Sequence, residues 1–368
     1  MSKSYSILAL GGDHIGPEVV AEGLKVIHVI TDLYGLEFQV EEDLLGGASW
    51  DAHGTFCTDE VLAKARAADA ILVGAVGGPE WDSIHIDGPI TETDGLTRLR
   101  IELDVYNALR PARAWSALLG QTPYRKEVVD GSDIMVIREN SGGIYYGEPR
   151  GYKTENDGQV HAFEISEYRT KEVERIARCA FEQARVRRNH LTSLDKSNVM
   201  ETGKLWRETV SRIGRDEYPD VRLDHLLMDY GLYAVAKAPR NFDVLLADNL
   251  FGDLMSDMVA NVAGSLGMLP SATLPGKTES GLAIKGGIYE PTHGSAPDIS
   301  GKGIANPIGT ILSVAMMCDY AFARPDIADA IEQAVEAAIN AGVRTGDLGG
   351  KATTIEMTAA IVAAMRAA

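Results

Sequence analysis

The sequence predicts an α/β fold, in which short buried strands alternate with amphipathic helices. Residues 5–10, 70–74, 133–138 and 243–248 are compact apolar runs, as expected of strands that are covered on both faces. Between such runs, apolar residues recur at helical spacing. Because this alternation is typical of sheets with helices on both faces, we expect a largely parallel sheet. The chain of 368 residues is long enough for about two domains.

Two helices are predicted with particular clarity. Residues 172–188 have apolar side chains on one face, acids at the start and three arginines at the end, which complements the helix dipole. Thr170 is the expected N-cap of this helix. Residues 326–341 show the same periodicity, and Gly342 is the expected stop.

Two other segments are expected to be connections. The segment GGDHIGPE at residues 11–18 follows a strand and opens a helix, but it lacks the GxGxxG spacing of a Rossmann loop. Its glycines suit either a tight turn or a ligand-binding turn. The polar segment at residues 147–164 is expected to be a loop or an arm.

The composition argues against several classes of protein. The net charge is −18 and lysines and arginines do not cluster, so nucleic acid is a poor candidate for a partner. No apolar run approaches the length of a membrane span, and we see no secretory signal pattern. Cys57, Cys179 and Cys318 are widely spaced and outside any CxxC motif, which favours reduced thiols in a cytoplasmic protein.

The strongest local signal for chemistry is a pair of acids, Asp253 and Asp257, in the segment NLFGDLMSDMVANVAGSLGMLPSA. On a helix, residues four apart share one face, so these carboxylates repel each other unless a cation joins them. Ligand sets made of oxygen alone suit Mg²⁺ or Mn²⁺. The alternative is a helix with two solvated acids, but the apolar, glycine-rich surroundings favour the metal.

Several arginines suggest a site for carboxylates. Arg98, Arg100, Arg110 and Arg113 fall close together, and Arg138 ends a later predicted strand. Arginine binds carboxylates through two parallel hydrogen bonds, so a converging set suits a substrate with two carboxylates. The alternative for each arginine alone is a surface ion pair.

Two further residues suggest proton transfer, and one loop suggests a nucleotide. Tyr145 follows a Ser-Gly-Gly segment at a strand end and suits a proton donor, whereas a lone tyrosine is more often merely half-buried. Lys196 in LDKSNV suits a base if it is buried, and a solvated group if it is not. In EPTHGSAPDISGKGIANP, at residues 290–307, backbone N–H groups suit a phosphate and Asp298 suits a ribose diol.

Taken together, these segments resemble the β-decarboxylating dehydrogenases, the family of isocitrate, isopropylmalate, homoisocitrate and tartrate/D-malate dehydrogenases. The resemblance runs from residue 7 to about residue 349, and it is carried above all by NLFGDLMSD…GSLGMLP and HGSAPDISGKGIANP. The segments GAVGGPEWD, SGGIYYGEPRG and GKGIANP most resemble the isopropylmalate enzymes.

The resemblance implies an α/β fold with a large mixed sheet in two domains, which is not a Rossmann fold. Residues 1–105 together with 264–368 would form the large domain, which carries the coenzyme-binding loop. Residues 106–263 would form the small domain, with the dimer interface and an arm.

The resemblance also implies an activity, the NAD-dependent and metal-requiring oxidative decarboxylation of a 3-substituted malate by a cytoplasmic homodimer with shared active sites. The first expectation is 3-isopropylmalate, in leucine biosynthesis. The alternative is D-malate, tartrate or another 3-substituted malate. A non-catalytic regulatory subunit is a further alternative, against which the retained residues argue.

Roles for individual residues follow from the same resemblance. Lys196, acting from the partner subunit, would take the hydroxyl proton, and Tyr145 would protonate the enol left when CO₂ departs. Asp253 and Asp257, with Asp229 of the partner subunit, would bind Mg²⁺ or Mn²⁺. The other implied contacts are Arg100, Arg110 and Arg138 to the substrate carboxylates, Leu96, Thr97, Asn198 and Val199 to the rest of the substrate, and His293, Gly294, Ser295, Ala296, Asp298, Ile299 and Asn306 to NAD.

One departure from the family pattern concerns the substrate. Isopropylmalate enzymes usually carry two leucines where this chain has Leu96 and Thr97, and Thr93 falls where they often have glutamate. Either Thr97 faces a smaller or more polar substituent, or it turns its hydroxyl to its own helix carbonyl and presents a methyl group. The close match elsewhere favours the second interpretation. A further departure is His14, where the family usually has glycine.

Overall fold

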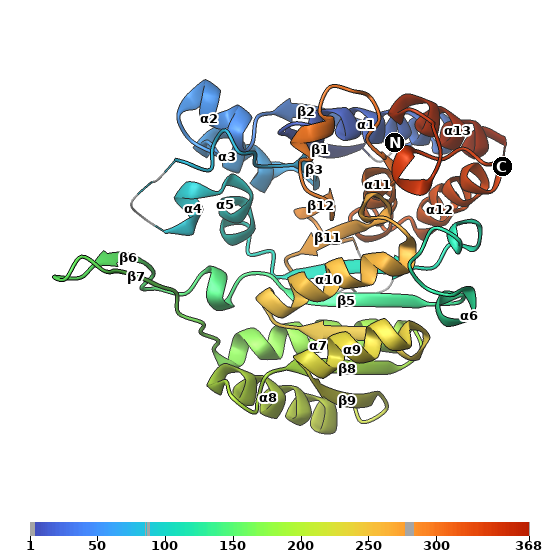
Figure 1. The fold of residues 1–368 in the computed structure, drawn as a ribbon. Helices are drawn as coiled ribbons and strands as arrows, with labels where there is room; N and C mark the ends of the chain where they lie inside the picture. The colour runs from blue at the N-terminus through green and yellow to red at the C-terminus, as the bar shows by residue number, and fades with distance from the viewer. Residues whose placement is uncertain (1–3, 85, 87–88, 277–282, 368) are drawn as a thin grey trace.

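The computed structural model describes residues 4–84, 86, 89–276 and 283–367, which are built around one ten-stranded sheet (Figure 1). From one edge to the other, its strands are β2 (Glu37–Asp43), β1 (Ser4–Gly12), β3 (Ala70–Ala75), β12 (Gly287–Pro291), β11 (Pro270–Leu274), β4 (Asn107–Arg113), β5 (Asp133–Glu139), β10 (Val244–Ala247), β8 (His190–Asp195) and β9 (Arg222–Leu227). The four strands predicted from apolar runs correspond to β1, β3, β5 and β10.

The sheet is mixed. Neighbouring strands are parallel in both outer parts of the sheet. At the centre, β11 is antiparallel to β12 and to β4, and β4 is antiparallel to β5. The predicted α/β class with a large mixed sheet is therefore confirmed, and so is the expectation that most of its neighbouring strands are parallel, with the antiparallel pairings confined to the centre.

Helices cover both faces of the sheet. They are α1 (Gly16–Tyr34), α2 (Gly47–His53), α3 (Asp59–Ala67), α4 (Ile90–Thr93), α5 (Gly95–Glu102), α6 (Lys126–Val129), α7 (Thr170–Val186), α8 (Glu201–Glu217), α9 (Met228–Lys237), α10 (Asn249–Ala263), α11 (Ile308–Tyr320), α12 (Pro325–Asn340) and α13 (Thr354–Ala367). None of the helices in the described ranges combines the length and apolar character that a membrane span requires.

Both helices that the sequence predicted clearly are present, as α7 and α12. The predicted cap of α7 is wrong by one residue, because the helix begins at Thr170 and Arg169 precedes it. The backbone N–H of Arg169 donates to the Glu172 carboxylate at 2.7 Å, which ties this end of the helix. Gly342, just beyond α12, has a φ of 87°, a left-handed conformation that suits the end of a helix.

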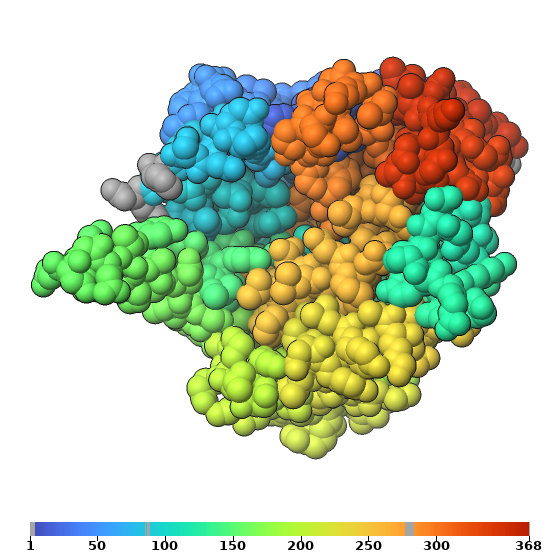
Figure 2. Space-filling view, viewed as in Figure 1, coloured from blue at the N-terminus to red at the C-terminus, as the bar shows by residue number. Residues whose placement is uncertain are grey.

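An arm projects from the body of the molecule. It is an antiparallel hairpin of β6 (Gly151–Thr154) and β7 (Val160–Phe163), and it extends well away from the rest of the chain (Figures 1 and 2). Two large apolar side chains are exposed on it, Tyr152 at 83% and Val160 at 64%. The interpretation of residues 147–164 as an arm is therefore confirmed.

The sheet divides between segments of the chain at the pairing of β11 with β4. Strands from both ends of the chain lie on the β11 side, and strands between residues 107 and 247 lie on the β4 side. The N- and C-terminal segments accordingly lie together in Figure 1. The division into domains of residues 1–105 with 264–368 and residues 106–263 stays a prediction.

Candidate active site

The centre of the site is the face of β4 and β5 that α10 covers. Arg110 on β4 and Arg138 on β5 point to this face, since cross-strand partners share a side and alternate residues return to it. Gly252 lets α10 pack closely, because a Cβ at this position would lie 2.7 Å from the Cβ of Arg138. The predicted metal ligands Asp253 and Asp257 lie on the same helix.

Residues predicted from separate segments of the sequence meet at Asp253. Arg110 Nη1 lies 3.3 Å from Asp253 Oδ1 and donates to Ser256 Oγ at 2.7 Å. Arg138 Nη1 donates to the same Asp253 oxygen. The hydroxyl of Tyr145 donates to Asp253 Oδ2 at 3.3 Å. The structure thus brings a predicted proton donor, two predicted carboxylate-binding arginines and a predicted metal ligand into one cluster.

The electrostatics of this cluster suit an anionic substrate. Arg110 and Arg138 are only 8% and 4% exposed. Burial lowers the pKa of Arg138 to about 10, and the positive charges of Arg110 and Arg100 act in the same direction. Three guanidinium groups that repel one another are stabilised by an incoming dicarboxylate. Buried positive charge is therefore concentrated at Arg100, Arg110 and Arg138, although the chain as a whole has a net charge of −18.

The acids of the cluster suit a divalent cation. Burial, followed by the charge of the neighbouring Asp253, raises the pKa of Asp257, as expected of two carboxylates that lie close together. Two carboxylates on adjacent helical turns form a ligand set of the kind that Mg²⁺ or Mn²⁺ prefers. Burial, followed by the charge of Asp253, raises the pKa of Tyr145, which keeps its proton available for donation.

Arg100 approaches from α5 and is held by an acid that sequence reasoning did not single out. Its Nη2 donates to Glu290 Oε1 at 2.6 Å, and both side chains are largely buried. Glu290 belongs to the otherwise apolar strand β12, and an acid at such a position was the available signal. Arg98 and Arg113 instead pair with Asp59 at 2.6 Å and Glu332 at 3.3 Å, the ion-pair alternative for these two arginines.

A second cluster contains the predicted base. Lys196 follows β8, Asp229 lies in the first turn of α9, and Lys196 Nζ donates to Asp229 Oδ1 at 2.5 Å. Asn198 and Val199 lie exposed on the same turn as Lys196. Across the described part of the chain, no three His, Cys, Asp or Glu residues are grouped to hold a metal. Asp229 therefore does not join Asp253 and Asp257 within one chain.

Large apolar side chains are exposed next to both clusters. Val199, close to Lys196, is 70% exposed, and Tyr230, next to Asp229, is 56% exposed. Leu254, next to Asp253, is 52% exposed, and Tyr233 on α9 is 56% exposed. The rings of Tyr230 and Tyr233 lie 6.0 Å apart, and large exposed apolar side chains of this kind are typical of a protein interface.

The predicted coenzyme loop runs from β12 to α11. Ser295 Oγ donates to the carbonyl of Gly77 at 2.6 Å, and the N–H of Ile15 donates to the carbonyl of Ser295 at 3.1 Å. Ala296 and Ile299 pack against the small apolar cluster that contains Ile15. These contacts fasten the loop to two other segments of the chain.

The polar groups on this loop differ in whether other residues of the chain already form hydrogen bonds with them. Asp298 and Gly294 are exposed, and His293 Nε2 is buried without a hydrogen-bond partner among the described residues. Such an unpaired nitrogen suits a ligand, and burial lowers the pKa of His293, which favours the neutral ring. The amide of Asn306 instead donates to Asp347 at 2.9 Å and accepts from the N–H of Ile308 at 3.0 Å.

The turn at residues 11–18 contacts this loop through the hydrogen bond from Ile15 to Ser295. The buried carboxylate of Asp13 accepts hydrogen bonds from three backbone N–H groups, those of Gly47, Ala48 and Gly77, at 2.7–2.9 Å. The structure therefore favours the tight-turn interpretation of this segment. His14 adopts a φ of 51°, and its Nε2 lies 3.3 Å from a Glu80 carboxylate oxygen.

Leu96 and Thr97 lie in the first turn of α5 and are each 8% exposed. Leu96 packs in a core cluster that includes Leu45 and Leu99. The N–H of Thr97 donates to the Asp94 side chain at 2.9 Å. Its hydroxyl makes no hydrogen bond to any described residue, so the preferred interpretation, with this hydroxyl on a helix carbonyl, does not match the structure.

Comparisons with known proteins agree with these motifs. The family model described as isocitrate/isopropylmalate dehydrogenase matches residues 6–361. A 3-isopropylmalate dehydrogenase of Pseudomonas fluorescens is 46% identical over 367 residues, covering 99% of each chain. One of Xanthomonas euvesicatoria is 46% identical over 366 residues, covering 98% of this chain and all of the relative.

Solved structures show the same fold. An isocitrate dehydrogenase of Methylococcus capsulatus superposes with a TM-score of 0.85 at 31% identity, covering 98% of this chain and 99% of the other. A beta-decarboxylating dehydrogenase of Thermococcus kodakarensis, in its apo form, gives a TM-score of 0.76 at 30% identity, covering 99% and 96%.

Proposed function

Because the chain belongs to the isocitrate/isopropylmalate dehydrogenase family, we propose that it catalyses the NAD-dependent oxidative decarboxylation of a 3-substituted malate, with 3-isopropylmalate of leucine biosynthesis as its substrate. The observation that carries this proposal is the meeting of Arg110, Arg138 and Tyr145 at Asp253. The relatives named as 3-isopropylmalate dehydrogenases, 46% identical over nearly their full length, favour this substrate.

The residues of the chain account for binding and proton transfer. Arg100, Arg110 and Arg138 would hold the two malate carboxylates, and Asp253 and Asp257 would hold the divalent cation. The cation would polarise the oxygen on the second carbon, and the nicotinamide would accept the hydride. Tyr145 supplies the proton that replaces CO₂ on the third carbon, and its raised pKa ensures that it is protonated at neutral pH.

The substrate hydroxyl needs a base, and the only candidate among the predicted residues is Lys196. It lies with Asp229 in a cluster of its own, so we propose that both act on the site of a second copy of the chain. The exposed Val199, Tyr230, Tyr233 and Leu254 supply an apolar surface for such a homodimer. The projecting arm, with Tyr152 and Val160 exposed, adds a further surface for the second copy.

The coenzyme preference follows from Asp298, which we place beside the ribose. The 2′-phosphate of NADP would meet the like charge of this exposed carboxylate, and repulsion at a partly solvated site corresponds to about tenfold in affinity or somewhat more. We therefore expect NAD to be preferred by at least about tenfold in kcat/KM. Asp298→Asn should narrow the preference, and equal use of both coenzymes by the wild type would contradict this placement.

The substrate test concerns Thr97. We expect 3-isopropylmalate to be turned over, with relaxed selectivity toward neighbouring malates, because threonine offers less apolar contact than leucine. Thr97→Leu should raise kcat/KM for 3-isopropylmalate by about tenfold or less, at about 0.8 kcal/mol for each additional buried methylene. Activity on D-malate serves as the control and should not rise in parallel.

The same assay separates the proposed substrate from its alternatives. Purified protein is supplied with NAD, Mg²⁺ and, in turn, 3-isopropylmalate, D-malate, tartrate and isocitrate, and NADH is followed by absorbance. If the wild type uses D-malate or tartrate and ignores 3-isopropylmalate, the proposed substrate is wrong while the reaction class stands. If no malate is turned over, the catalytic proposal is wrong.

A further inference from the structure

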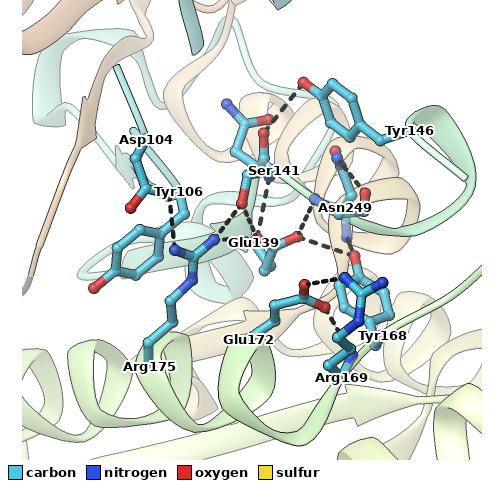
Figure 3. Close-up of polar contacts among 12 residues, drawn as sticks. Asp104, Tyr106, Glu139, Ser141, Tyr146, Tyr168, Arg169, Glu172, Arg175 and Asn249 are labelled. Carbon is cyan, nitrogen blue, oxygen red and sulfur yellow. Dashed lines mark hydrogen bonds and ion pairs between the residues drawn. The ribbon is translucent and has the colours of Figure 1, made fainter. Parts of the chain in front are cut away.

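Glu139, which follows Arg138 on β5, carries a buried carboxylate that none of the proposed steps uses. Glu139 ends β5 and is 0% exposed. Burying a carboxylate is costly unless its oxygens are satisfied, so each of its contacts contributes to one defined arrangement. Figure 3 shows that these contacts come from the loop that follows β5, from the segment before α7 and from α7 itself.

Glu139 fixes the start of the loop that carries Tyr145. Its Oε1 accepts from the backbone N–H and the hydroxyl of Ser141 at 3.1 and 2.7 Å, and its Oε2 accepts from the N–H of Gly142 at 2.9 Å. Arg175 of α7 donates to Ser141 Oγ at 2.6 Å. Tyr145 follows within a few residues, so the carboxylate determines where the loop begins its approach to Asp253.

The same carboxylate also fixes the start of α10, through Tyr168. The hydroxyl of Tyr168 donates to Glu139 Oε2 at 3.1 Å and accepts from the backbone N–H of Asn249 at 3.0 Å. Asn249 is the first residue of α10, the helix that carries Asp253 and Asp257. One hydroxyl therefore joins the loop with the proton donor to the helix with the proposed metal ligands.

Asn249 connects this hydrogen-bond network to Arg138. Its Oδ1 accepts from Arg138 Nε at 3.0 Å and from Nη2 at 2.7 Å, and its Nδ2 donates to the carbonyl of Gly142 at 2.9 Å. With these two nitrogens held, Nη1 is the guanidinium nitrogen that faces Asp253. The orientation of Arg138 thus depends on the same loop and helix that Glu139 and Tyr168 hold.

The Ser-Gly-Gly segment shows how tightly these parts fit. A Cβ at Gly142 would lie 2.8 Å from a ring carbon of Tyr168, and one at Gly143 would lie 2.6 Å from the Tyr168 hydroxyl. Gly143 also has a φ of 77°, which other residues rarely adopt. The two glycines therefore allow the loop to lie against Tyr168, and the segment is a close-packed support for Tyr145.

We propose that Glu139, Tyr168 and Asn249 are positioning residues, which together hold Tyr145 and Arg138 in their catalytic orientations around Asp253. The inference rests on the proposed function, because it assigns these residues to the same reaction. It adds that geometry at the reacting carbon depends on a hydrogen-bond network that does not touch the substrate. Misplacement of a catalytic group by about 1 Å is enough to lower a rate by about a hundredfold.

The test is Tyr168→Phe, which removes one hydroxyl and leaves both Glu139 Oε2 and the Asn249 N–H short of a partner. We expect kcat with 3-isopropylmalate to fall by about ten- to a hundredfold, while the KM for NAD stays within about twofold. Since a misplaced Tyr145 slows proton delivery, the solvent deuterium isotope effect on kcat should rise above that of the wild type. A role in folding alone would lower the melting temperature and leave kcat and the isotope effect unchanged.

Tyr106→Phe is the matched control. Tyr106 is a buried tyrosine beside the same network, but its hydroxyl lies 3.9 Å from Cys179 Sγ and does not reach the loop or α10. The kcat of the Tyr106→Phe protein should equal that of the wild type. Ser141→Ala removes one bond to Glu139 from the other end of the network and should also lower kcat, which keeps the test decisive if Tyr168→Phe is poorly folded.

The outcomes separate the inference from the proposed function. Wild-type turnover of a substituted malate, together with a wild-type kcat and isotope effect for folded Tyr168→Phe and Ser141→Ala, would overturn the inference alone. An equal loss in Tyr106→Phe and Tyr168→Phe would overturn it as well, because the effect would then be general. Failure of the wild type itself on every substituted malate would count against the proposed function.

Discussion

Replacement of Asp253 by asparagine is expected to abolish almost all turnover, with a loss of several orders of magnitude in kcat. Asp253 is the point at which Arg110, Arg138 and Tyr145 converge, and it is one of the two proposed metal ligands on α10. An amide cannot replace a carboxylate toward a divalent cation without loss of charge, and it also alters the hydrogen bonds to three other residues. The measurement is NADH formation with 3-isopropylmalate and saturating Mg²⁺.

The proposed metal requirement can also be tested by removing the metal from the wild-type protein. Wild-type protein treated with EDTA should lose its activity, and added Mg²⁺ or Mn²⁺ should restore it, whereas Asp253→Asn should not recover. Asp319→Asn is a suitable control, because Asp319 is a partly buried acid on α11 with no hydrogen bond or ion pair to another described residue. Undiminished activity of the wild type in EDTA would remove the metal from the mechanism.

How far the sequence predicted this site depended on whether spacing along the chain reveals what a residue does. Asp253 and Asp257 could be proposed from spacing on one helix, and their helix is present as α10. Glu139 and Asn249 were not singled out, although both are within 1% of complete burial, because their importance lies in hydrogen bonds to residues distant in the sequence. Such contacts have no local periodicity that a pattern could reveal.

The arginines illustrate the same limit. Four were candidates because they lie close together in the sequence and Arg138 because it ends a predicted strand, and the structure brings Arg100, Arg110 and Arg138 close enough for their charges to repel one another. Arg110 and Arg113 are three residues apart on β4, and alternation along a strand sends them to opposite faces of the sheet. A strand assignment for residues 107–113 would have separated these two, but that segment does not form a compact apolar run.

The sequence predicted the class of the fold correctly, but it predicted the topology of the sheet only in part. Buried strands are apolar whether their neighbours run parallel or antiparallel, so the apolar runs predicted strands such as β3 and β5 without revealing their neighbours. The antiparallel pairings of β11 and β4 at the centre of the sheet come from strands that the runs did not identify. Only the family resemblance indicated a mixed sheet.

The second large effect is the recovery of activity from two inactive proteins. Lys196→Ala and Tyr145→Phe should each be nearly inactive alone. If each site combines Tyr145 of one chain with Lys196 of the other, a heterodimer of these variants contains one intact site and one site with both defects. With random exchange, half of the dimers are heterodimers, so about a quarter of the wild-type activity should return.

The contact between Lys196 and Asp229 provides a stringent control for this experiment. Because these side chains are bonded to each other at 2.5 Å within one chain, both should serve the same site. A heterodimer of Lys196→Ala with Asp229→Asn then has one defect in each site, and no activity should return, although subunit exchange is equally complete. Differently tagged chains and native mass spectrometry establish that heterodimers have formed. If such verified heterodimers of Lys196→Ala with Tyr145→Phe stay inactive, each site is built from a single chain, and the cluster of Lys196 with Asp229 needs another explanation.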